Sequence, residues 1–291
     1  MDCKNLRLKL LSGNLMPIIG FGTYRIRGTE LIRDVLDYAL SSGYRSIDTA
    51  YVYGNEKHIG EALKDLLPKY NLKREDIFII TKLPPSHHGD KAVTALRSSL
   101  ENLDCGYVDL YLIHWPGQAG SSIKDSSNRN VRTKTWQYFV DFKKKGLVRN
   151  IGVSNYTISH LEELIANSFG EVPVVNQVEW HPHYHPSDLL NYCQKHGILL
   201  QAYSSLGGTN NSHLISDSEV VEIAKRLDKQ PAQILLRWAL QQNIAIIPKG
   251  CSKEHIQANI DLNFEIPEMD MTKLNNLKVS HKYAWNPDEV L

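Results

Sequence analysis

Apolar residues along the chain alternate between short continuous runs and longer stretches with helical spacing. Short runs that are bounded by turn residues are typical of buried strands, and spacings of three and four are typical of amphipathic helices. The runs predict strands at 18–22, 45–49, 77–81, 108–113, 151–153, 174–178, 198–202 and 244–247. The spacings predict helices at 31–39, 59–66, 93–103, from 136, and at 158–165, 189–193, 220–227, 231–240, from 252, and at 271–277.

Three signals at helix ends support this assignment. Gly43 and Pro68 follow two of the helical stretches and are expected to end them. Pro231 opens another stretch, where a proline is well tolerated. Residues 116–130 are rich in Gly, Ser, Asn and Lys, which predicts a loop.

Strict alternation of strand and helix implies a parallel sheet. Eight such units in 291 residues favour an α/β fold, a closed (β/α)8 TIM barrel formed by one domain that spans residues 1–291. Segments 6–11 and 15–18 predict an N-terminal β-hairpin that plugs the lower end of the barrel, and the last helix is an extra C-terminal one. A doubly wound open sheet is the competing fold, but no GxGxxG sequence follows the first strand.

Composition excludes several classes of protein. The chain has 33 basic and 32 acidic residues and a net charge of +1, which argues against nucleic acid or a membrane surface as a partner. No apolar run approaches the ~18 residues of a membrane span. The 4 cysteines are far apart and form no CxxC, so we expect a reducing compartment. We also expect a cytoplasmic protein that is a monomer.

Polar and aromatic side chains follow nearly every predicted strand. In α/β barrels the chemistry lies at the carboxyl ends of the strands, so these side chains would converge on one pocket. The set is Tyr24, Asp48, Tyr53, Lys82, His114, Trp115, Ser154, Asn155, Asn176, Gln177, Glu179, Tyr203, Ser204 and Lys249.

An aspartate, a lysine and a tyrosine from this set suggest the protonation of a carbonyl oxygen. Asp48 and Lys82 on neighbouring strands would form a buried ion pair, and the lysine cation would lower the pKa of a nearby tyrosine. Such a tyrosine can protonate a carbonyl oxygen, with a histidine to orient it. No side chain donates hydride, so a cofactor is required. Residues 249–252 open the last barrel helix, which predicts a phosphate site there.

Several motifs carry a resemblance to a known family. They are GFGTY at 20–24, DTAYVYGNE at 48–56, TK at 81–82, VDLYLIHWP at 108–116, IGVSN at 151–155, NQVEWHP at 176–182, AYS at 202–204 and IPK at 247–249. With these motifs in order over nearly the whole chain, the sequence resembles the aldo-keto reductase family.

The resemblance implies an NADPH-dependent carbonyl reductase that acts on a small-molecule carbonyl. Tyr53 would donate the proton, Lys82 paired with Asp48 would tune it, and His114 would orient the substrate. The implied cofactor-binding residues are Gly22, Thr23, Tyr24, Asp48, Ser154, Asn155, Gln177, Tyr203, Ser204, Leu206, Lys249, Gly250, Cys251, Ser252, His255 and Asn259. The implied substrate pocket consists of Tyr24, Val52, Tyr53, His114, Trp115 and Trp180, with no metal.

The chain departs from the family pattern at the adenosine end of the cofactor. Gly250 stands where the family usually has Ser, His255 where it has Arg, and Ala258 where it has Glu. An imidazole holds a 2′-phosphate less firmly than a planar guanidinium. We therefore expect NADPH to be preferred, with NADH as a weaker alternative. Ser205 replaces a frequent Pro, and the chain ends soon after 285–287, which suggests a looser loop and an open pocket roof.

Two other functions stay open from the residues alone. Residues 181–185 (HPHYH) offer alternating imidazoles, which would suit a metal-dependent barrel hydrolase, although loop histidines are the simpler interpretation. A non-catalytic nucleotide-binding or structural protein could share the fold. His87 and His88 are expected in a surface turn, and the 116–130 and 207–213 loops are expected to set specificity.

Overall fold

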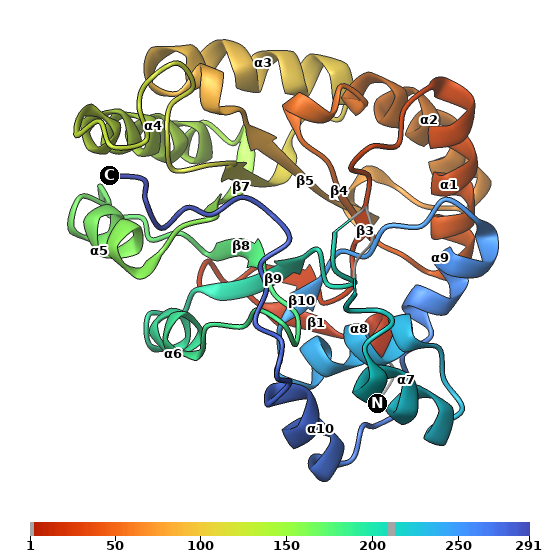
Figure 1. Ribbon diagram of the computed structural model, residues 1–291. Helices are drawn as coiled ribbons and strands as arrows, with labels where there is room; N and C mark the ends of the chain where they lie inside the picture. Colours follow the sequence, from red (N-terminus) through yellow and green to blue (C-terminus); the bar gives the residue numbers. More distant parts are fainter. Residues whose placement is uncertain (1–2, 209–212) are drawn as a thin grey trace.

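A computed structural model describes residues 3–208 and 213–291, so part of the expected 207–213 loop lies outside the described residues. Eight parallel strands form one sheet in the order β10-β9-β8-β7-β6-β5-β4-β3, which follows the chain (Figure 1). The strands are β3 (Phe21–Gly22), β4 (Ser46–Asp48), β5 (Phe78–Leu83), β6 (Val108–Ile113), β7 (Val148–Ser154), β8 (Val175–Glu179), β9 (Leu199–Tyr203) and β10 (Ala245–Ile246).

Hydrogen bonds between the two edge strands close this sheet into a barrel. Ile19 forms a parallel bridge with Ile246. The Gly20 amide donates to the Ile246 carbonyl at 2.8 Å, and the Gly22 amide donates to the Pro248 carbonyl at 3.0 Å. A Cβ on Gly22 would lie 2.6 Å from the Ile247 carbonyl oxygen, so this close approach requires glycine. The predicted (β/α)8 barrel is confirmed.

Helices cover the outside of the barrel and connect successive strands (Figure 1). Their apolar faces pack on the strands, which are buried almost throughout. The helices are α1 (Thr29–Ser42), α2 (Glu56–Lys69), α3 (Ala92–Leu103), α4 (Ser127–Lys144), α5 (Ile158–Ala166), α6 (Ser187–Lys195), α7 (Ser218–Arg226), α8 (Pro231–Gln241), α9 (Lys253–Ile260) and α10 (Glu268–Asn275).

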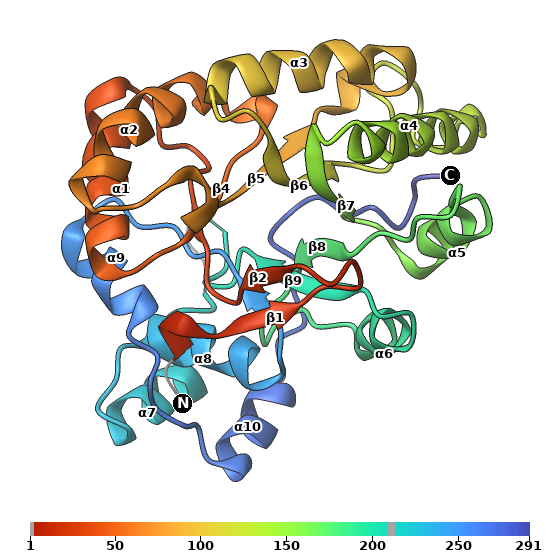
Figure 2. The ribbon, with the colours of Figure 1, turned by 180° about the vertical axis from the view of Figure 1, so that it is seen from behind.

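The two additions to the barrel lie where the sequence predicted them. Strands β1 (Arg7–Lys9) and β2 (Leu15–Pro17) form an antiparallel hairpin. It lies across the amino-terminal end of the barrel, nearest the viewer in Figure 2. Helix α10 follows the last barrel helix, and the chain then crosses the opposite end of the barrel to finish beside α4 and α5 (Figure 1).

Two predicted boundaries are wrong. The 116–130 loop is shorter than expected, because α4 begins at Ser127. The first turn of α4 is polar, but hydrogen bonds fix it in place. The Asp125 side chain accepts from the Ser127 amide at 2.8 Å, and the buried side chains of Asn128 and Arg132 donate to the Ser122 and Pro116 carbonyls. Helix α2 continues to Lys69, with Pro68 in its last turn, where little of the helix remains to be broken.

Among the described residues, none of the helices combines the length and the apolar character that crossing a bilayer requires.

Candidate active site

Four side chains from three adjacent strand ends gather at the carboxyl end of the barrel. Asp48 is the last residue of β4, Lys82 lies in β5, and His114 directly follows β6. Tyr53 ends a 3-10 turn, η2 (Tyr51–Tyr53), that comes three residues after β4. The parallel register pairs β4 with β5 and β5 with β6, so the strand ends lie side by side.

The ammonium group of Lys82 is buried and has three hydrogen-bond acceptors around it. Lys82 Nζ lies 2.7 Å from Asp48 Oδ1, 2.8 Å from the Thr49 carbonyl oxygen and 3.5 Å from Tyr53 Oη. An ammonium group has three protons, and these three acceptors use all of them. Burial lowers the pKa of Lys82, and the Asp48 carboxylate opposes that effect.

The tyrosine hydroxyl keeps its proton over the ordinary pH range. Burial, with the Asp48 carboxylate adding to it, raises the pKa of Tyr53 well above its ordinary value. The sequence-based expectation of a lowered pKa is therefore wrong for this structure. The physical reason is that burial penalises the charged tyrosinate, and the nearby Asp48 carboxylate adds to that penalty.

The histidine beside this tyrosine is neutral. The His114 and Tyr53 ring centroids are 5.8 Å apart, edge to face. Burial and the charge of Lys82 lower the pKa of His114 to about 3. A neutral imidazole can offer one N–H donor to an oxygen atom, whereas its other ring nitrogen accepts.

A chain of amides crosses the barrel to the same carboxylate. Gln177 Nε2 on β8 lies 2.8 Å from Asp48 Oδ2 and 2.8 Å from Gln201 Oε1 on β9. Gln201 was not predicted. The only available signal was a polar residue within an otherwise apolar strand run. These contacts fix Asp48 from the side opposite Lys82.

Next to the four residues, the ends of β7 and β9 form a hydrogen-bonded rim. Asn155 Nδ2 donates to the His114 carbonyl at 3.0 Å, and Tyr203 Oη donates to Asn155 Oδ1 at 2.6 Å. Ser154 Oγ donates to the Gln177 carbonyl at 2.8 Å. Asn155 and Ser204 have left-handed φ values of 64° and 51°, which turns the chain sharply outward at both strand ends.

The segment after β10 presents cationic and hydroxyl groups at a helix N-terminus. Ser252 is the N-cap of α9 and its Oγ accepts from the His255 amide at 3.3 Å. Asn259 Nδ2 donates to the Lys249 carbonyl at 3.5 Å, which folds the segment back on the helix. Cys251 and His255 are exposed. Within residues 3–208 and 213–291, no ion pair engages the Lys249 ammonium.

The remaining predicted cofactor residues lie on two segments at this end of the barrel. Thr23 is buried and its Oγ1 donates to the Asp48 carbonyl at 2.8 Å. Gly22 closes the barrel, as described above, and Leu206 is half-buried after β9. A Cβ on Gly250 would lie 2.9 Å from Ile256 Cγ1, so the absence of a side chain there keeps the turn compact.

Aromatic groups surround the entrance. The Tyr24 and Tyr53 ring centroids are 5.0 Å apart, and Tyr24 and Val52 are 42% and 49% exposed. Trp115 packs edge to face with Trp285 at 6.3 Å. Trp285 was not predicted, because it lies in a C-terminal stretch without strand or helix periodicity.

Trp180, by contrast, does not lie at the entrance. Its side chain is 1% exposed and stacks on Trp238 of α8, with ring centroids 6.4 Å apart. The expectation that Trp180 lines the substrate pocket is therefore corrected: the ring faces outward from the barrel, into the layer between β8 and α8.

The histidines singled out in the sequence are engaged in structural contacts. His181 Nε2 lies 3.0 Å from Glu179 Oε1, and His183 Nε2 lies 3.2 Å from Asp217 Oδ2. In the described part of the chain, no three His, Cys, Asp or Glu side chains are grouped so that they could hold a metal ion. His88 is buried, not part of a surface turn, and burial lowers its pKa to about 4.

The comparison with known proteins agrees with this geometry. A model of the Aldo/keto reductase family matches residues 18–278. The chain belongs to this family. Its strand order, its barrel closure and the four clustered side chains are thus features of an aldo/keto reductase.

Two relatives of this aldo/keto reductase have names that describe an activity. A protein of Bacillus subtilis named glyoxal reductase is 37% identical over 98% of this chain and 97% of its own length. Glycerol 2-dehydrogenase (NADP(+)) of Saccharomyces cerevisiae is 35% identical over 97% of this chain and 96% of its own length. Both names describe oxidoreductases, and the family membership makes this chain an oxidoreductase of carbonyl compounds.

Solved structures of aldo/keto reductases superpose closely on it. MGS-M4, an aldo-keto reductase from a deep-sea metagenome library of the Medee basin, has a TM-score of 0.88 and 37% identity over 97% of this chain and 98% of its own. The Bombyx mori aldo-keto reductase in complex with NADP has a TM-score of 0.87 and 32% identity over 96% of this chain and 94% of its own.

Proposed function

We propose that the protein is an NADPH-dependent reductase of aldehydes and ketones, with Tyr53 as the proton donor. The observation that carries this proposal is the arrangement around one hydroxyl group. Lys82 Nζ lies 3.5 Å from Tyr53 Oη, and His114 packs edge-on against the same ring. A protonated phenol beside a neutral imidazole and a cation suits a reaction that delivers a proton to an oxygen atom.

Each of the four residues has a distinct part. Tyr53 holds the proton at Oη and donates it to the carbonyl oxygen. Lys82 stabilises the tyrosinate that forms, because its third N–H points at that oxygen. Asp48 keeps the ammonium in place through the 2.7 Å contact. His114, neutral at ordinary pH, donates a hydrogen bond that orients the carbonyl oxygen.

The residues of this site fit nicotinamide adenine dinucleotide phosphate (NADPH). When bound, this cofactor supplies hydride to the carbonyl carbon. Ser154, Asn155 and Gln177 offer amide and hydroxyl groups for a carboxamide, and the Tyr203 ring offers a flat face. Helix α9, with its Ser252 N-cap and the Lys249 ammonium nearby, suits a phosphate. The names of the yeast and Bombyx proteins, which print NADP, support this assignment.

The spectroscopic oxidation of NADPH and NADH tests the proposal. Both nucleotides are offered with a panel of glyoxal, propanal, benzaldehyde, an aldose and a keto-steroid. We expect turnover with NADPH on at least one aldehyde, and slower turnover with NADH. Tight binding of nucleotide without turnover on any carbonyl would favour the non-catalytic binding protein, and the absence of nucleotide binding would overturn both.

We further propose that the enzyme acts as a monomer in the cytoplasm. Among the described residues the four cysteines form no disulfide; Cys3, Cys105 and Cys193 are buried and Cys251 is exposed, which suits a reducing compartment. Light scattering coupled to size-exclusion chromatography checks the mass, for which a monomer gives 33.1 kDa.

A further inference from the structure

The turn that carries Tyr53 is short and only partly buried. Within η2 and its flanks, the Tyr53 amide donates to the Ala50 carbonyl at 2.9 Å. The Gly54 amide donates to the Tyr51 carbonyl at 3.3 Å. Val52 is 49% exposed, and none of the three residues of η2 is fully buried as a whole. The position of the turn therefore depends on the segments on either side of it.

One buried amide next to this turn has no part in the proposed chemistry. Asn55 follows the turn and is 0% exposed. Its Oδ1 accepts from Thr49 Oγ1 at 2.7 Å, and its Nδ2 donates to the carbonyl oxygens of Thr23 and Ile26, both at 3.0 Å. An amide side chain has two N–H donors and one acceptor oxygen, and here all of them are used. Three segments of the chain therefore meet at one side chain.

The contact with Thr49 ties the turn to the lysine of the site. The Thr49 carbonyl accepts from Lys82 Nζ at 2.8 Å. Thr49 directly follows Asp48, whose carboxylate lies 2.7 Å from the same ammonium group. Through Thr49, Asn55 therefore fixes where the Tyr53 turn lies relative to Lys82.

The two carbonyl contacts tie the turn to the Tyr24 ring. The Ile26 amide donates to the Thr23 carbonyl at 3.1 Å, which closes a β-turn with Tyr24 and Arg25 at its centre. Arg25 has a left-handed φ of 63°, a conformation that favours glycine at this position of a turn. Asn55 binds the carbonyls at both ends of this β-turn and so stabilises it. The Tyr24 ring is thereby held 5.0 Å from the ring of the proposed acid.

The residue after Asn55 adds a tie to the strand that carries the lysine. Glu56 begins α2 and is 3% exposed, and its Oε1 accepts from Thr81 Oγ1 at 2.6 Å. Thr81 directly precedes Lys82 in β5. The start of α2 is therefore anchored on β5, which leaves the Asn55 side chain little freedom to move.

We propose that Asn55 is a positioning residue that holds the Tyr53 turn, so that the Tyr53 hydroxyl stays within hydrogen-bond distance of Lys82. This inference rests on the proposed reductase function. Asn55 transfers no proton and acts through Thr49 and through the 23–26 turn. A shift of about 1 Å in a reacting group can slow a reaction by about 10²-fold. Loss of these hydrogen bonds should therefore slow the chemical step while nucleotide and substrate still bind.

Single-turnover reduction of an aldehyde by Asn55→Ala tests this role. We expect the rate constant per nucleotide-binding site to fall about tenfold to hundredfold, because the proton donor is no longer held in place. We expect KM and the NADPH dissociation constant to stay within about threefold of the wild-type values, because ground-state binding is not what the contact supplies. An unchanged rate constant per nucleotide-binding site would overturn the proposal.

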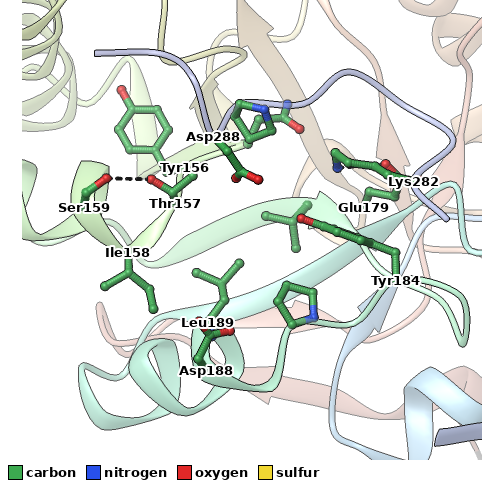
Figure 3. A pocket seen from close by; sticks show the side chains of 14 residues that line it. Tyr156, Thr157, Ile158, Ser159, Glu179, Tyr184, Asp188, Leu189, Lys282 and Asp288 are labelled. Atoms are coloured by element: carbon green, nitrogen blue, oxygen red, sulfur yellow. Dashed lines mark hydrogen bonds and ion pairs between the residues drawn. The ribbon is translucent and has the colours of Figure 1, made fainter. Parts of the chain in front are cut away.

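Two control variants separate this effect from a general loss of stability. Asn150→Ala removes a buried amide at the opposite end of the barrel, where it bonds to the β1–β2 hairpin and to the Asp109 carbonyl. Ser159→Ala removes a hydroxyl contact with Thr157 at the same end of the barrel as Tyr53. That contact lies at the edge of a groove of about 320 Å³ between the starts of α5 and α6 (Figure 3). Neither change should alter the rate constant per site, and a fall as large as that of Asn55→Ala would contradict a specific role.

The partner hydroxyl gives a second test that holds where Asn55→Ala does not fold. Thr49→Val removes the Oγ1 donor and keeps the main-chain carbonyl that accepts from Lys82. We expect the rate constant to fall about threefold to tenfold, and the double variant with Asn55→Ala to fall no further than Asn55→Ala alone, because both changes break one contact. Effects that multiply, or a Thr49→Val enzyme with the wild-type rate, would overturn the assignment.

A measurement without turnover separates this proposal from the reductase function. NMR spectra are recorded of the free protein labelled with ¹³C at tyrosine Cζ, and the Tyr53 signal is assigned from its loss in Tyr53→Phe. This signal reports hydrogen bonding at the hydroxyl, so it should move or broaden in Asn55→Ala and Thr49→Val and stay in place in Asn150→Ala. A moved signal supports the positioning role even where the wild-type protein turns over no aldehyde. Turnover by the wild-type protein with an unmoved Tyr53 signal in both variants would overturn the positioning role and leave the reductase function standing.

Discussion

Lys82 Nζ lies 2.7 Å from Asp48 Oδ1, and the two side chains are 0% and 2% exposed. A buried ion pair is stable only when its remaining protons and lone pairs are also satisfied. Here Thr49 and Tyr53 take the other ammonium protons, and Gln177 donates to the second carboxylate oxygen. The pair is therefore a rigid support for the tyrosine hydroxyl.

Replacing the lysine tests this role. Lys82→Met leaves Asp48 charged and buried without its cation, so we expect the free energy of unfolding to fall by about 3–5 kcal/mol. We expect carbonyl reduction to fall by about 10²–10⁴-fold, because the tyrosinate that forms loses its stabilising charge. Urea unfolding and NADPH oxidation measure the two effects.

The double variant Lys82→Met/Asp48→Asn separates stability from chemistry. It removes both charges, so we expect most of the stability to return while the rate stays low. A double variant that recovered the rate together with the stability would show that the lysine acts only on folding.

Tyr53→Phe removes the proposed acid and little else. The ring contacts to Tyr24 and His114 persist, because the ring itself is unchanged. We expect turnover to fall by about 10²–10⁴-fold with the nucleotide dissociation constant unchanged within about twofold. Stopped-flow reduction and fluorescence titration of NADPH measure both. Near-normal turnover in this variant would mean that another group donates the proton.

The pKa shifts predict how the rate depends on pH. Because burial raises the pKa of Tyr53 and lowers that of His114 to about 3, both groups stay neutral between about pH 5 and pH 9. Reduction needs the phenol, so its rate should be flat over this range. Alcohol oxidation needs the tyrosinate, so its rate should rise about tenfold per pH unit.

Initial rates in both directions across a constant-ionic-strength buffer series check this expectation. A fall in the reduction rate with rising pH, with its midpoint between about pH 6 and pH 8, would contradict the raised pKa of Tyr53. Burial also lowers the pKa of Lys82, so the alkaline limb reports whichever of the two groups loses its proton first.

A glycine in α2 gives a prediction about stability. Helix α2 crosses the end of α3 so closely that a Cβ on Gly60 would lie 2.6 Å from the carbonyl oxygens of Asn102 and Leu103. Both are backbone atoms, so Gly60→Ala should lower the free energy of unfolding by about 1–3 kcal/mol despite its better helix propensity. Thr94→Ala, at an exposed position of α3, is the control. An unchanged urea midpoint for Gly60→Ala would show that the helices can separate without cost.

The barrel was predictable because its strands are apolar runs and its helices are amphipathic, so each element carries its own signal. The polar side chains that follow the apolar runs likewise predicted that Asp48, Lys82 and His114 lie together at the carboxyl ends of the strands. Helix α4 was predicted to start too late, because its first turns are polar and carry no apolar periodicity. Asn128 and Arg132 are nevertheless buried, and Arg132 donates to the carbonyl of Leu291, a partner far away in sequence that leaves no local pattern.

The direction of the Tyr53 pKa was out of reach of the sequence for a similar reason. Spacing predicted that a lysine lies near the tyrosine, but the pKa is raised first by burial of the hydroxyl, which depends on how segments distant in sequence pack around it. The contacts of Glu179 with the amides of Tyr283 and Ala284 join residues more than a hundred positions apart and have no sequence pattern.

The exposed imidazole of His255 leads to the last prediction. His255 lies in the first turn of α9, beside the Ser252 N-cap, at the position where the family resemblance implies an arginine that holds the 2′-phosphate. A guanidinium presents several donors in a planar fork that matches a phosphate. His255→Arg should therefore tighten NADPH binding by about threefold to tenfold and leave NADH binding unchanged, because NADH lacks that phosphate. Fluorescence titration with both nucleotides at two salt concentrations measures this.

The control variant is Lys253→Arg, two residues before His255 in the same turn and also exposed. It adds a guanidinium without adding charge, so it should change the dissociation constant of neither nucleotide. Equal tightening of NADPH and NADH by His255→Arg would place the 2′-phosphate elsewhere and return the choice of cofactor to Lys249.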